Sequence, residues 1–255
     1  MLVLLVLGAV LAQYVLHSTW MAAENFSSPS FIMSNGHQKT GDKYILDDFR
    51  EAYYWLKQNT DKDSKILSWW DYGYQITGMS NRTVIVDNNT WNNTHIATVA
   101  KCLISDEEEG YRIAKSLDAK YVLVVFGGYA YYTGDDLAKF LWFVRIAGSV
   151  WPKIDERDYY KNGNFGPRSW ELSDKMKESL TYKMLYNQFG SVLIYNDEPP
   201  GYDRARHGEI AHKDIQFKHF KEVYTSQQWM VRIYEVLPEE NRAARYEGVE
   251  RRTFI

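Results

Sequence analysis

The sequence is poor in cysteine, since Cys102 is the single cysteine among 255 residues. One thiol excludes an intrachain disulfide and any cysteine-rich metal site. The chain also lacks a basic surplus, because 33 Asp and Glu residues outnumber 30 Lys and Arg residues, for a formal net charge of −3. Nucleic-acid-binding proteins usually carry an excess of positive charge, so we expect no nucleic-acid partner. The low mean hydropathy excludes a polytopic membrane protein, but not a chain with one apolar end.

The histidines do not form a metal-binding motif. His207 and His212 enclose the string HGEIAH, with His219 nearby. This string is not the H-E-x-x-H pattern of zinc proteases, and it lies in a segment rich in Pro, Gly and charge that is typical of a loop. We therefore predict a solvated loop and no metal site in this chain.

Long apolar runs are also scarce, and residues 1–16 (MLVLLVLGAVLAQYVL) are the exception. As a helix this run spans roughly 24 Å, short of the ~30 Å hydrocarbon core of a membrane. A signal peptide would need a basic residue before the run, and a core helix would need a polar face. We favour the end of a transmembrane helix that begins upstream, with Trp20 at the membrane interface. On this hypothesis residues 1–22 are the end of a transmembrane helix, and we expect the chain to be a fragment of a longer protein.

N-x-Ser/Thr triplets point to the compartment. They begin at Asn25, Asn81, Asn88 and Asn92, and the last two lie within one seven-residue stretch. Such triplets are acceptors of N-linked glycans in secreted or luminal segments. We therefore expect the bulk of the chain to lie in the lumen of the endoplasmic reticulum, anchored at its membrane.

Strand and helix patterns alternate between residues 65 and 147, which predicts an α/β fold. We expect a mixed luminal globular domain over residues 46–237, with a central sheet and flanking helices. A linker over 23–45 precedes it, and a charged tail over 238–255 follows it. The expected helices cover a segment from Asp47 or Asp48, as its cap, to about Thr60, then 71–79, 94–104, 107–117, a segment from Thr133 or Asp135 to 147, and 173–189. The expected strands cover 65–69, 82–87, 120–126, 191–195 and 228–237, and the apolar run 120–126 is suited to a central strand buried on both faces.

The most specific local feature is the string WWDYG at residues 69–73. Adjacent tryptophans on a strand point to opposite faces, so at least one of them meets solvent or a ligand. Asp71 lies at the junction of a predicted strand and a predicted helix, where its carboxylate can cap the helix. Alternatively, the carboxylate accepts a hydrogen bond from a ligand hydroxyl, to which an indole N–H can donate.

The string WWDYG, followed by DNNTWNNTH at residues 87–95, resembles the C-terminal luminal domain of the catalytic subunit of eukaryotic oligosaccharyltransferase. Enzymes of this family transfer a lipid-linked oligosaccharide to the Asn of N-x-Ser/Thr sequons. The resemblance implies that this chain is part of a glycosyltransferase of N-linked glycosylation. Further matching segments cover residues 17–20, 27–30, 47–55 and 232–234, so the resemblance extends over nearly the whole chain.

The resemblance assigns recognition of the acceptor's +2 Ser or Thr hydroxyl to Trp69, Trp70 and Asp71. Tyr72 and Gly73 complete this motif. A site whose buried polar groups require a hydroxyl strongly rejects an analogue without it.

The family also carries a helical D-x-x-K-x-x-x-(Met/Ile) pattern, which Asp136 and Lys139 match. Phe143 stands at the last position instead of Met or Ile, where the family residue is expected to contact the methyl group of an acceptor Thr. Spacings of three, four and seven place these residues on one helix face. From the residues alone, the same pattern describes an ordinary surface ion pair between Asp136 and Lys139 beside a core Phe.

The resemblance further implies glycosylation at Asn92, and less so at Asn88. It implies Mn²⁺ or Mg²⁺ in the full-length enzyme, with metal ligands and catalytic carboxylates outside this chain. The expected partners are an acceptor polypeptide, a dolichyl-diphosphate oligosaccharide donor and other oligosaccharyltransferase subunits. The alternative is a naturally short, membrane-anchored, non-catalytic module that binds sequons.

Overall fold

The computed structural model describes residues 1–26, 33–36, 43–195 and 198–239. The predicted tail over 238–255 lies almost wholly outside these ranges, and so does much of the predicted linker over 23–45. Within that linker the structure has a two-stranded antiparallel hairpin, formed by β1 (Met33–Gly36) and β2 (Lys43–Leu46). The prediction of a plain linker is therefore wrong for these strands.

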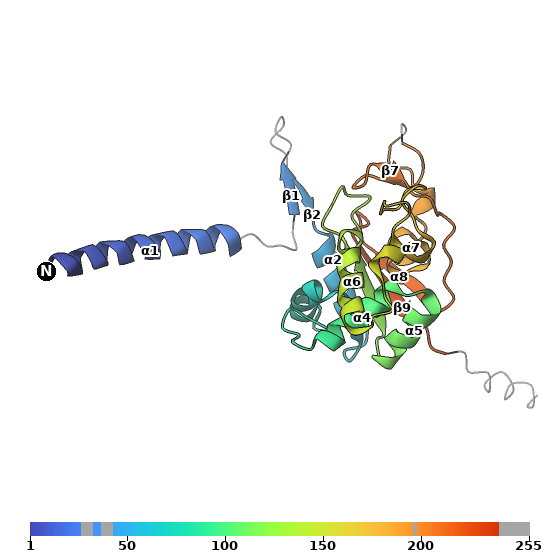
Figure 1. The fold of residues 1–255 in the computed structure, drawn as a ribbon, viewed down its shortest axis with the longest axis horizontal. Helices are drawn as coiled ribbons and strands as arrows, with labels where there is room; N and C mark the ends of the chain where they lie inside the picture. Colours follow the sequence, from blue (N-terminus) through green and yellow to red (C-terminus); the bar gives the residue numbers. More distant parts are fainter. Residues whose placement is uncertain (27–32, 37–42, 196–197, 240–255) are drawn as a thin grey trace, which may run out of the picture.

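The N-terminal helix α1 (Leu2–Phe26) projects from the globular part of the molecule (Figure 1). Its segment Leu2–Ala23 is long and apolar enough to cross a membrane, and none of its most apolar window is buried. At 1.5 Å per residue these 22 residues span about 33 Å, so the estimate from residues 1–16 is too short. The helix continues because residues 17–23 contain no breaker. Its exposure also argues against a core helix.

The globular part consists of short helices around a small sheet. Its helices are α2 (Asp48–Asn59), α3 (Gly73–Gln75), α4 (Asn93–Ile104), α5 (Glu107–Ser116), α6 (Asp136–Val150), α7 (Asp174–Glu178) and α8 (Leu180–Tyr186). Single turns of other helix types are η1 (Trp70–Tyr72), η2 (Ile76–Ser80), η3 (Glu156–Tyr159) and η4 (Phe189–Ser191), of which η2 is a π-helix. The remaining strands are β3 (Lys65–Leu67), β4 (Thr83–Val84), β5 (Tyr121–Val125), β6 (Tyr202–Asp203), β7 (Gly208–Glu209), β8 (Phe220–Thr225) and β9 (Val231–Val236).

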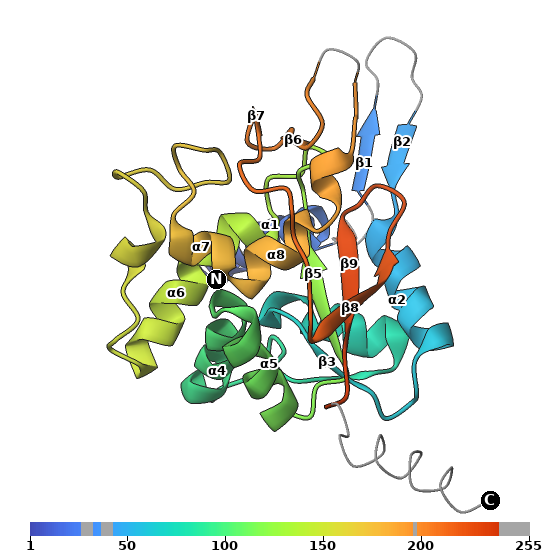
Figure 2. The same ribbon diagram turned by 90° about the vertical axis from the view of Figure 1, so that its right-hand side faces the viewer.

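The main sheet has five strands in the order β4-β3-β5-β9-β8. Strands β4, β3 and β5 are parallel, whereas β9 pairs antiparallel with both β5 and β8. Helix α2 covers one face of this sheet, and α4, α5, α6 and α8 lie on the other side (Figure 2). The predicted mixed α/β fold with a central sheet and flanking helices is confirmed.

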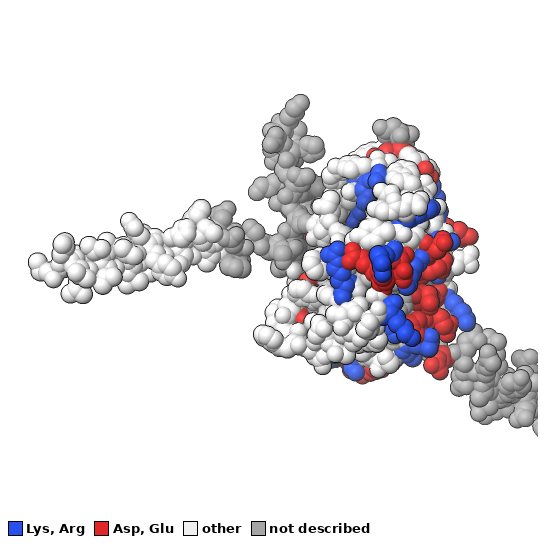
Figure 3. Space-filling view, viewed as in Figure 1, with Lys and Arg blue, Asp and Glu red and all other residues white. Residues whose placement is uncertain are grey.

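Strand β5 is the middle strand, and its residues 122–125 are buried because helices cover both faces. This confirms the prediction from the apolar run 120–126. Charged side chains form a band across the globular part, whereas the part of α1 drawn in white has none (Figure 3).

Other predicted elements differ from the structure. The helix expected over 173–189 is broken into α7 and α8 at Ser179, whose extended ψ of 145° ends one helix while its side chain caps the next. No strand forms over 191–195; strand β8 was not predicted at all. The helix expected over 71–79 is a succession of three helix types, η1, α3 and η2. The strand expected over 82–87 shrinks to two residues.

Candidate functional site

The residues of the WWD string follow directly after β3, and α6 follows the next parallel strand, β5. The carboxyl ends of parallel strands meet at one edge of a sheet, which is where α/β folds place ligands. Asp136, the first residue of α6, is fixed at this edge because its Oδ2 accepts a hydrogen bond from Val125 N at 2.8 Å. The fold thus brings together two motifs that are more than 60 residues apart in the sequence.

Four side chains form a continuous hydrogen-bonded chain at this edge. Lys139 Nζ donates to Asp71 Oδ2 at 2.6 Å and to the Tyr72 hydroxyl at 2.7 Å. The Tyr72 hydroxyl in turn donates to Asp136 Oδ1 at 2.9 Å. The side chains of Asp71 and Lys139 are 29% and 23% exposed, whereas Asp136 and Tyr72 are buried beneath them.

One oxygen of Asp71 has no partner. Its Oδ1 is buried and accepts no hydrogen bond from any described residue, while Oδ2 is held by Lys139. Buried acceptors are almost always satisfied in folded proteins, and an orphaned one calls for an explanation. Oδ1 therefore keeps the capacity to accept a hydrogen bond from a donor such as a hydroxyl, which can reach this buried oxygen only when the neighbouring side chains move.

Two interpretations from the residues alone are wrong. Asp71 does not cap a helix, because it lies inside η1 and makes no capping hydrogen bond. Asp136 and Lys139 do not form a direct surface ion pair; the Lys139 ammonium pairs with Asp71, and the Tyr72 hydroxyl lies between Lys139 and Asp136.

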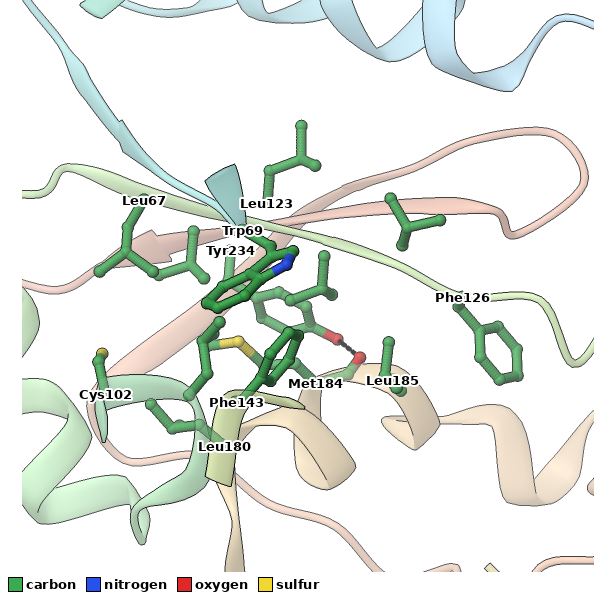
Figure 4. Packing of buried hydrophobic residues seen from close by; sticks show 14 of the residues in the cluster. Leu67, Trp69, Cys102, Leu123, Phe126, Phe143, Leu180, Met184, Leu185 and Tyr234 are labelled. Carbon is green, nitrogen blue, oxygen red and sulfur yellow. Dashed lines mark hydrogen bonds between the residues drawn. The ribbon is translucent and has the colours of Figure 1, made fainter. Parts of the chain in front are cut away.

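The structure places Trp69 and Phe143 in the core. Trp69 is 3% exposed and Phe143 is 0% exposed, and their ring centroids lie 4.4 Å apart. Figure 4 shows the two rings side by side, with Met184 next to them. Neither ring is in a position to contact a peptide directly in this conformation. Trp70, which is partly exposed, is the tryptophan of the pair that meets the surface.

We expect Phe143→Met to lower stability rather than to change acceptor preference. The ring is fully buried against Trp69, so its loss costs about 1–3 kcal/mol of the free energy of unfolding, by imperfect repacking. The ratio of transfer to N-x-Thr and N-x-Ser acceptors should stay unchanged. Urea unfolding of this chain and competition between the two acceptors measure both quantities. A changed acceptor ratio at unchanged stability would contradict the buried placement.

Gly73 has a steric role in the motif. A Cβ at this position would lie 2.5 Å from Cα of Asp87 and 2.8 Å from the carbonyl oxygen of Val86. Only glycine permits this close approach between the WWD segment and the segment that leads into the double sequon, the two N-x-Thr triplets that begin at Asn88 and Asn92. Asn88 adds a weaker link, since its Oδ1 accepts a hydrogen bond from Tyr74 N at 3.3 Å.

The double sequon lies on the surface before α4. Asn92 is exposed and is the N-cap of α4, where its Oδ1 accepts a hydrogen bond from His95 N at 3.1 Å. Capping uses the amide oxygen, and this hydrogen bond does not involve the amide nitrogen. Asn88 is also exposed, but its Nδ2 is directed at the main-chain oxygen of Asp71, 3.5 Å away.

The described residues do not fit a divalent metal ion. No group of three or more His, Cys, Asp or Glu side chains suited to holding one occurs among them. At the candidate site the Lys139 ammonium already lies against the partly exposed Asp71 carboxylate, at 2.6 Å. We therefore assign no metal-dependent step to this part of the chain.

Tyr72 is the site residue whose contacts the sequence does not reveal. Its hydroxyl joins Asp136 to Lys139, but 64 residues separate Tyr72 from Asp136 in the sequence. No local periodicity encodes a contact at that separation. The helical spacing of Asp136 and Lys139 marks a common face, which the structure confirms, without indicating the tyrosine between them.

Comparison with known proteins identifies relatives of this chain. Residues 62–135 match the family model described as the STT3/PglB/AglB core domain. The chain is 55% identical over 233 residues to the dolichyl-diphosphooligosaccharide–protein glycosyltransferase subunit STT3B of Arabidopsis thaliana, covering 91% of this chain and 31% of that protein. It is 49% identical over 238 residues to subunit STT3 of Dictyostelium discoideum, covering 93% of this chain and 33% of that protein.

Among solved structures, the C-terminal globular domain of an oligosaccharyltransferase from Archaeoglobus fulgidus matches with a TM-score of 0.46 and 20% identity, covering 76% of this chain and 99% of that chain. The family assignment rests on the sequence relatives, of which this chain spans about a third of the length. Identity near half over more than nine-tenths of this chain shows common descent. The chain belongs to the STT3 family of oligosaccharyltransferase subunits.

Proposed function

We propose that this chain is the acceptor-recognition part of a glycosyltransferase that moves an oligosaccharide from a dolichyl-diphosphate donor to the Asn of N-x-Ser/Thr sequons. The names of the relatives supply the reaction class. Asp71 supplies the recognition, by accepting a hydrogen bond from the +2 hydroxyl of the acceptor. The apolar helix α1 is consistent with a place at the membrane, which we propose to be that of the endoplasmic reticulum.

The orphaned Oδ1 of Asp71 carries this proposal. A hydroxyl donor satisfies it, and Lys139 prevents the second oxygen from competing. The indole of Trp70 lies beside this carboxylate in the chain and is partly exposed, so it forms the wall of the site. Trp69 and Phe143 pack against each other in the core, and this buried pair holds the backbone that leads into Asp71.

The remaining chemistry lies outside the described residues in this proposal. Transfer from a lipid pyrophosphate calls for a divalent cation, Mn²⁺ or Mg²⁺, to stabilise the departing phosphate. We place its ligands, the catalytic carboxylates and the donor site in the part of the relatives that this chain does not span. The other subunits of the enzyme are expected partners of the whole protein.

We also propose that Asn92 carries an N-linked glycan and that Asn88 does so less readily. The Asn92 amide nitrogen is left free by the capping hydrogen bond, which involves only the oxygen. The Asn88 amide is engaged by Tyr74 and faces the main chain of Asp71. A glycan on Asn92 therefore leaves α4 intact, whereas one on Asn88 competes with contacts that hold the WWD segment.

Weak binding of acceptor peptides by this chain alone tests the recognition role. We expect the indole N–H resonance of Trp70 to shift when a peptide containing N-x-Thr is added to the ¹⁵N-labelled chain in detergent. A peptide with Val in place of Thr has the same shape but no hydroxyl, and it should leave the resonance in place at the same concentration. Equal shifts with both peptides would show that the hydroxyl is not read here.

A further inference from the structure

The Tyr72 hydroxyl occupies the centre of the hydrogen-bonded chain described above. It accepts from Lys139 Nζ at 2.7 Å and donates to Asp136 Oδ1 at 2.9 Å. Lys139 Nζ also lies 4.3 Å from the centroid of the Tyr72 ring, within range of a cation–π contact. The ammonium therefore contacts Tyr72 through two different features of the same side chain.

The direction of these hydrogen bonds is fixed by chemistry. A lysine ammonium can only donate, so the Tyr72 oxygen must accept from it. The single hydroxyl hydrogen of Tyr72 is then left for Asp136. The Tyr72 hydroxyl thus links the buried Asp136 carboxylate to the Lys139 ammonium. These two hydrogen bonds hold the ammonium at a fixed position beside Asp71.

We propose that Tyr72 is a positioning residue for acceptor binding: it holds the Lys139 ammonium on Asp71 Oδ2, so that Oδ1 stays free for the acceptor hydroxyl. This inference rests on the proposed function of Asp71. Without the Tyr72 hydroxyl, Lys139 loses one of its two oxygen partners and Asp136 loses a donor inside the core. The ammonium can then shift across the carboxylate and cover the oxygen that the acceptor needs.

The surroundings of Asp136 make this positioning dependent on pH. Besides Lys139 on its own helix, Asp136 is faced by Tyr53 from α2, by Asp71 and Tyr72 from η1, and by Tyr132 from the connection between β5 and α6. Burial raises the pKa of Asp136 to about 7, against the opposing effect of Lys139.

The sign of the pH effect follows from the hydrogen bonds. Above this pKa, Asp136 is ionised and accepts the Tyr72 hydrogen. Below it, the protonated carboxyl becomes a donor that competes with Lys139 for the Tyr72 oxygen. The KM for acceptor should therefore rise as pH falls through about 7, because Lys139 is held less firmly.

Kinetics of Tyr72→Phe in the intact oligosaccharyltransferase test the proposal. We expect the KM for an N-x-Thr peptide to rise on the order of tenfold, with kcat changed less than about twofold, because only acceptor binding is affected. Tyr111→Phe is the matched control. Tyr111 is also buried, and its hydroxyl donates to the main-chain oxygen of Leu237 at 2.8 Å. An unchanged KM in Tyr72→Phe, or an equal rise in the control, overturns the proposal.

The pH profile of the KM supplies a second readout, for which the wild-type enzyme alone already gives a test. In the wild-type enzyme and in Tyr111→Phe the KM should rise about severalfold between pH 8 and pH 6, as Asp136 takes up a proton. In Asp136→Asn, which cannot ionise, the KM should be high and independent of pH in this range. A flat wild-type profile, or an unaltered slope in Asp136→Asn, contradicts the positioning role.

Comparison of Asp71→Asn with Tyr72→Phe separates the role of Tyr72 from the role of Asp71. If Asp71→Asn impairs use of the acceptor but Tyr72→Phe and the pH profile show no effect on KM, Asp71 reads the hydroxyl without help from Tyr72. If Asp71→Asn has no effect either, the recognition role itself is wrong.

Discussion

Asp71→Asn is expected to reduce kcat/KM for an N-x-Thr acceptor by about 100-fold or more in the intact enzyme, because a charged acceptor of the substrate hydroxyl is lost. The amide that replaces the carboxylate is nearly the same size. However, it no longer attracts Lys139 by charge, and half of its hydrogen-bonding capacity is that of a donor. The ammonium now 2.6 Å from Oδ2 is released, and the Oδ1 position loses its charge. Initial rates of transfer at several acceptor concentrations measure the effect.

The fold should survive this change. Asp71 is partly exposed, makes no capping hydrogen bond, and contributes one ion pair of a kind that typically adds little to stability. We expect urea unfolding of the Asp71→Asn chain to shift by less than about 1 kcal/mol. Asp118→Asn is a suitable control, since Asp118 pairs with Lys65 on the surface at 3.1 Å, away from the WWD string. A large loss of stability in Asp71→Asn would mean that its effect on transfer is indirect.

Arg232→Met is expected to have the largest effect on stability, about 3–5 kcal/mol of the free energy of unfolding. Arg232 lies on β9 and is 0% exposed. Its guanidinium donates to the carbonyl oxygens of Leu185 at 2.7 Å and of Asn187 at 2.8 Å, and it pairs with Glu222 at 2.6 Å. The last carbonyl groups of a helix have no partner within the helix. Arg232 satisfies those at the end of α8 and joins this helix to the sheet.

Methionine can replace only the aliphatic part of the arginine side chain and has no donor, so the substitution leaves the buried carbonyl groups without their donor and Glu222 without its cation. Arg157→Met is the matched control, because Arg157 pairs with Asp155 on the surface and its side chain is 90% exposed. We expect the control to lose less than about 1 kcal/mol. Urea unfolding of both variants, compared with the wild-type chain, gives the two values. Similar losses in both would show that Arg232 is not the anchor described above.

The parts of the fold that could be predicted from the sequence have a local cause. Helix α6 begins where Asp135 caps it, by accepting from Ala138 N at 3.1 Å, and β5 is a continuous apolar run. The order β4-β3-β5-β9-β8 could not be predicted, because it depends on pairings between distant segments. Strand β8 could not be predicted because it is an edge strand whose sequence, FKEVYT, shows little apolar periodicity.

The candidate site shows the same division. The string WWDYG and the helical spacing of Asp136 and Lys139 mark both halves of the site in the sequence. The Tyr72 hydroxyl joins these two halves through hydrogen bonds to Asp136 and Lys139. Because these are contacts between distant segments, no local sequence pattern predicts them. The role expected for Phe143 illustrates the converse, since position in a motif does not show that a side chain is accessible.

The central claim is that Asp71 accepts a hydrogen bond from the +2 hydroxyl of the acceptor. The most direct measurement is a cycle of four transfer rates, with wild-type and Asp71→Asn enzyme acting on N-x-Thr and N-x-Val peptides. We predict that replacing Thr by Val lowers kcat/KM by about 100-fold or more in the wild-type enzyme, and by less than about tenfold in Asp71→Asn, since the partner of the hydroxyl is already gone. If Asp71→Asn discriminates between the two peptides as strongly as the wild-type enzyme, another group reads the hydroxyl and the claim is wrong.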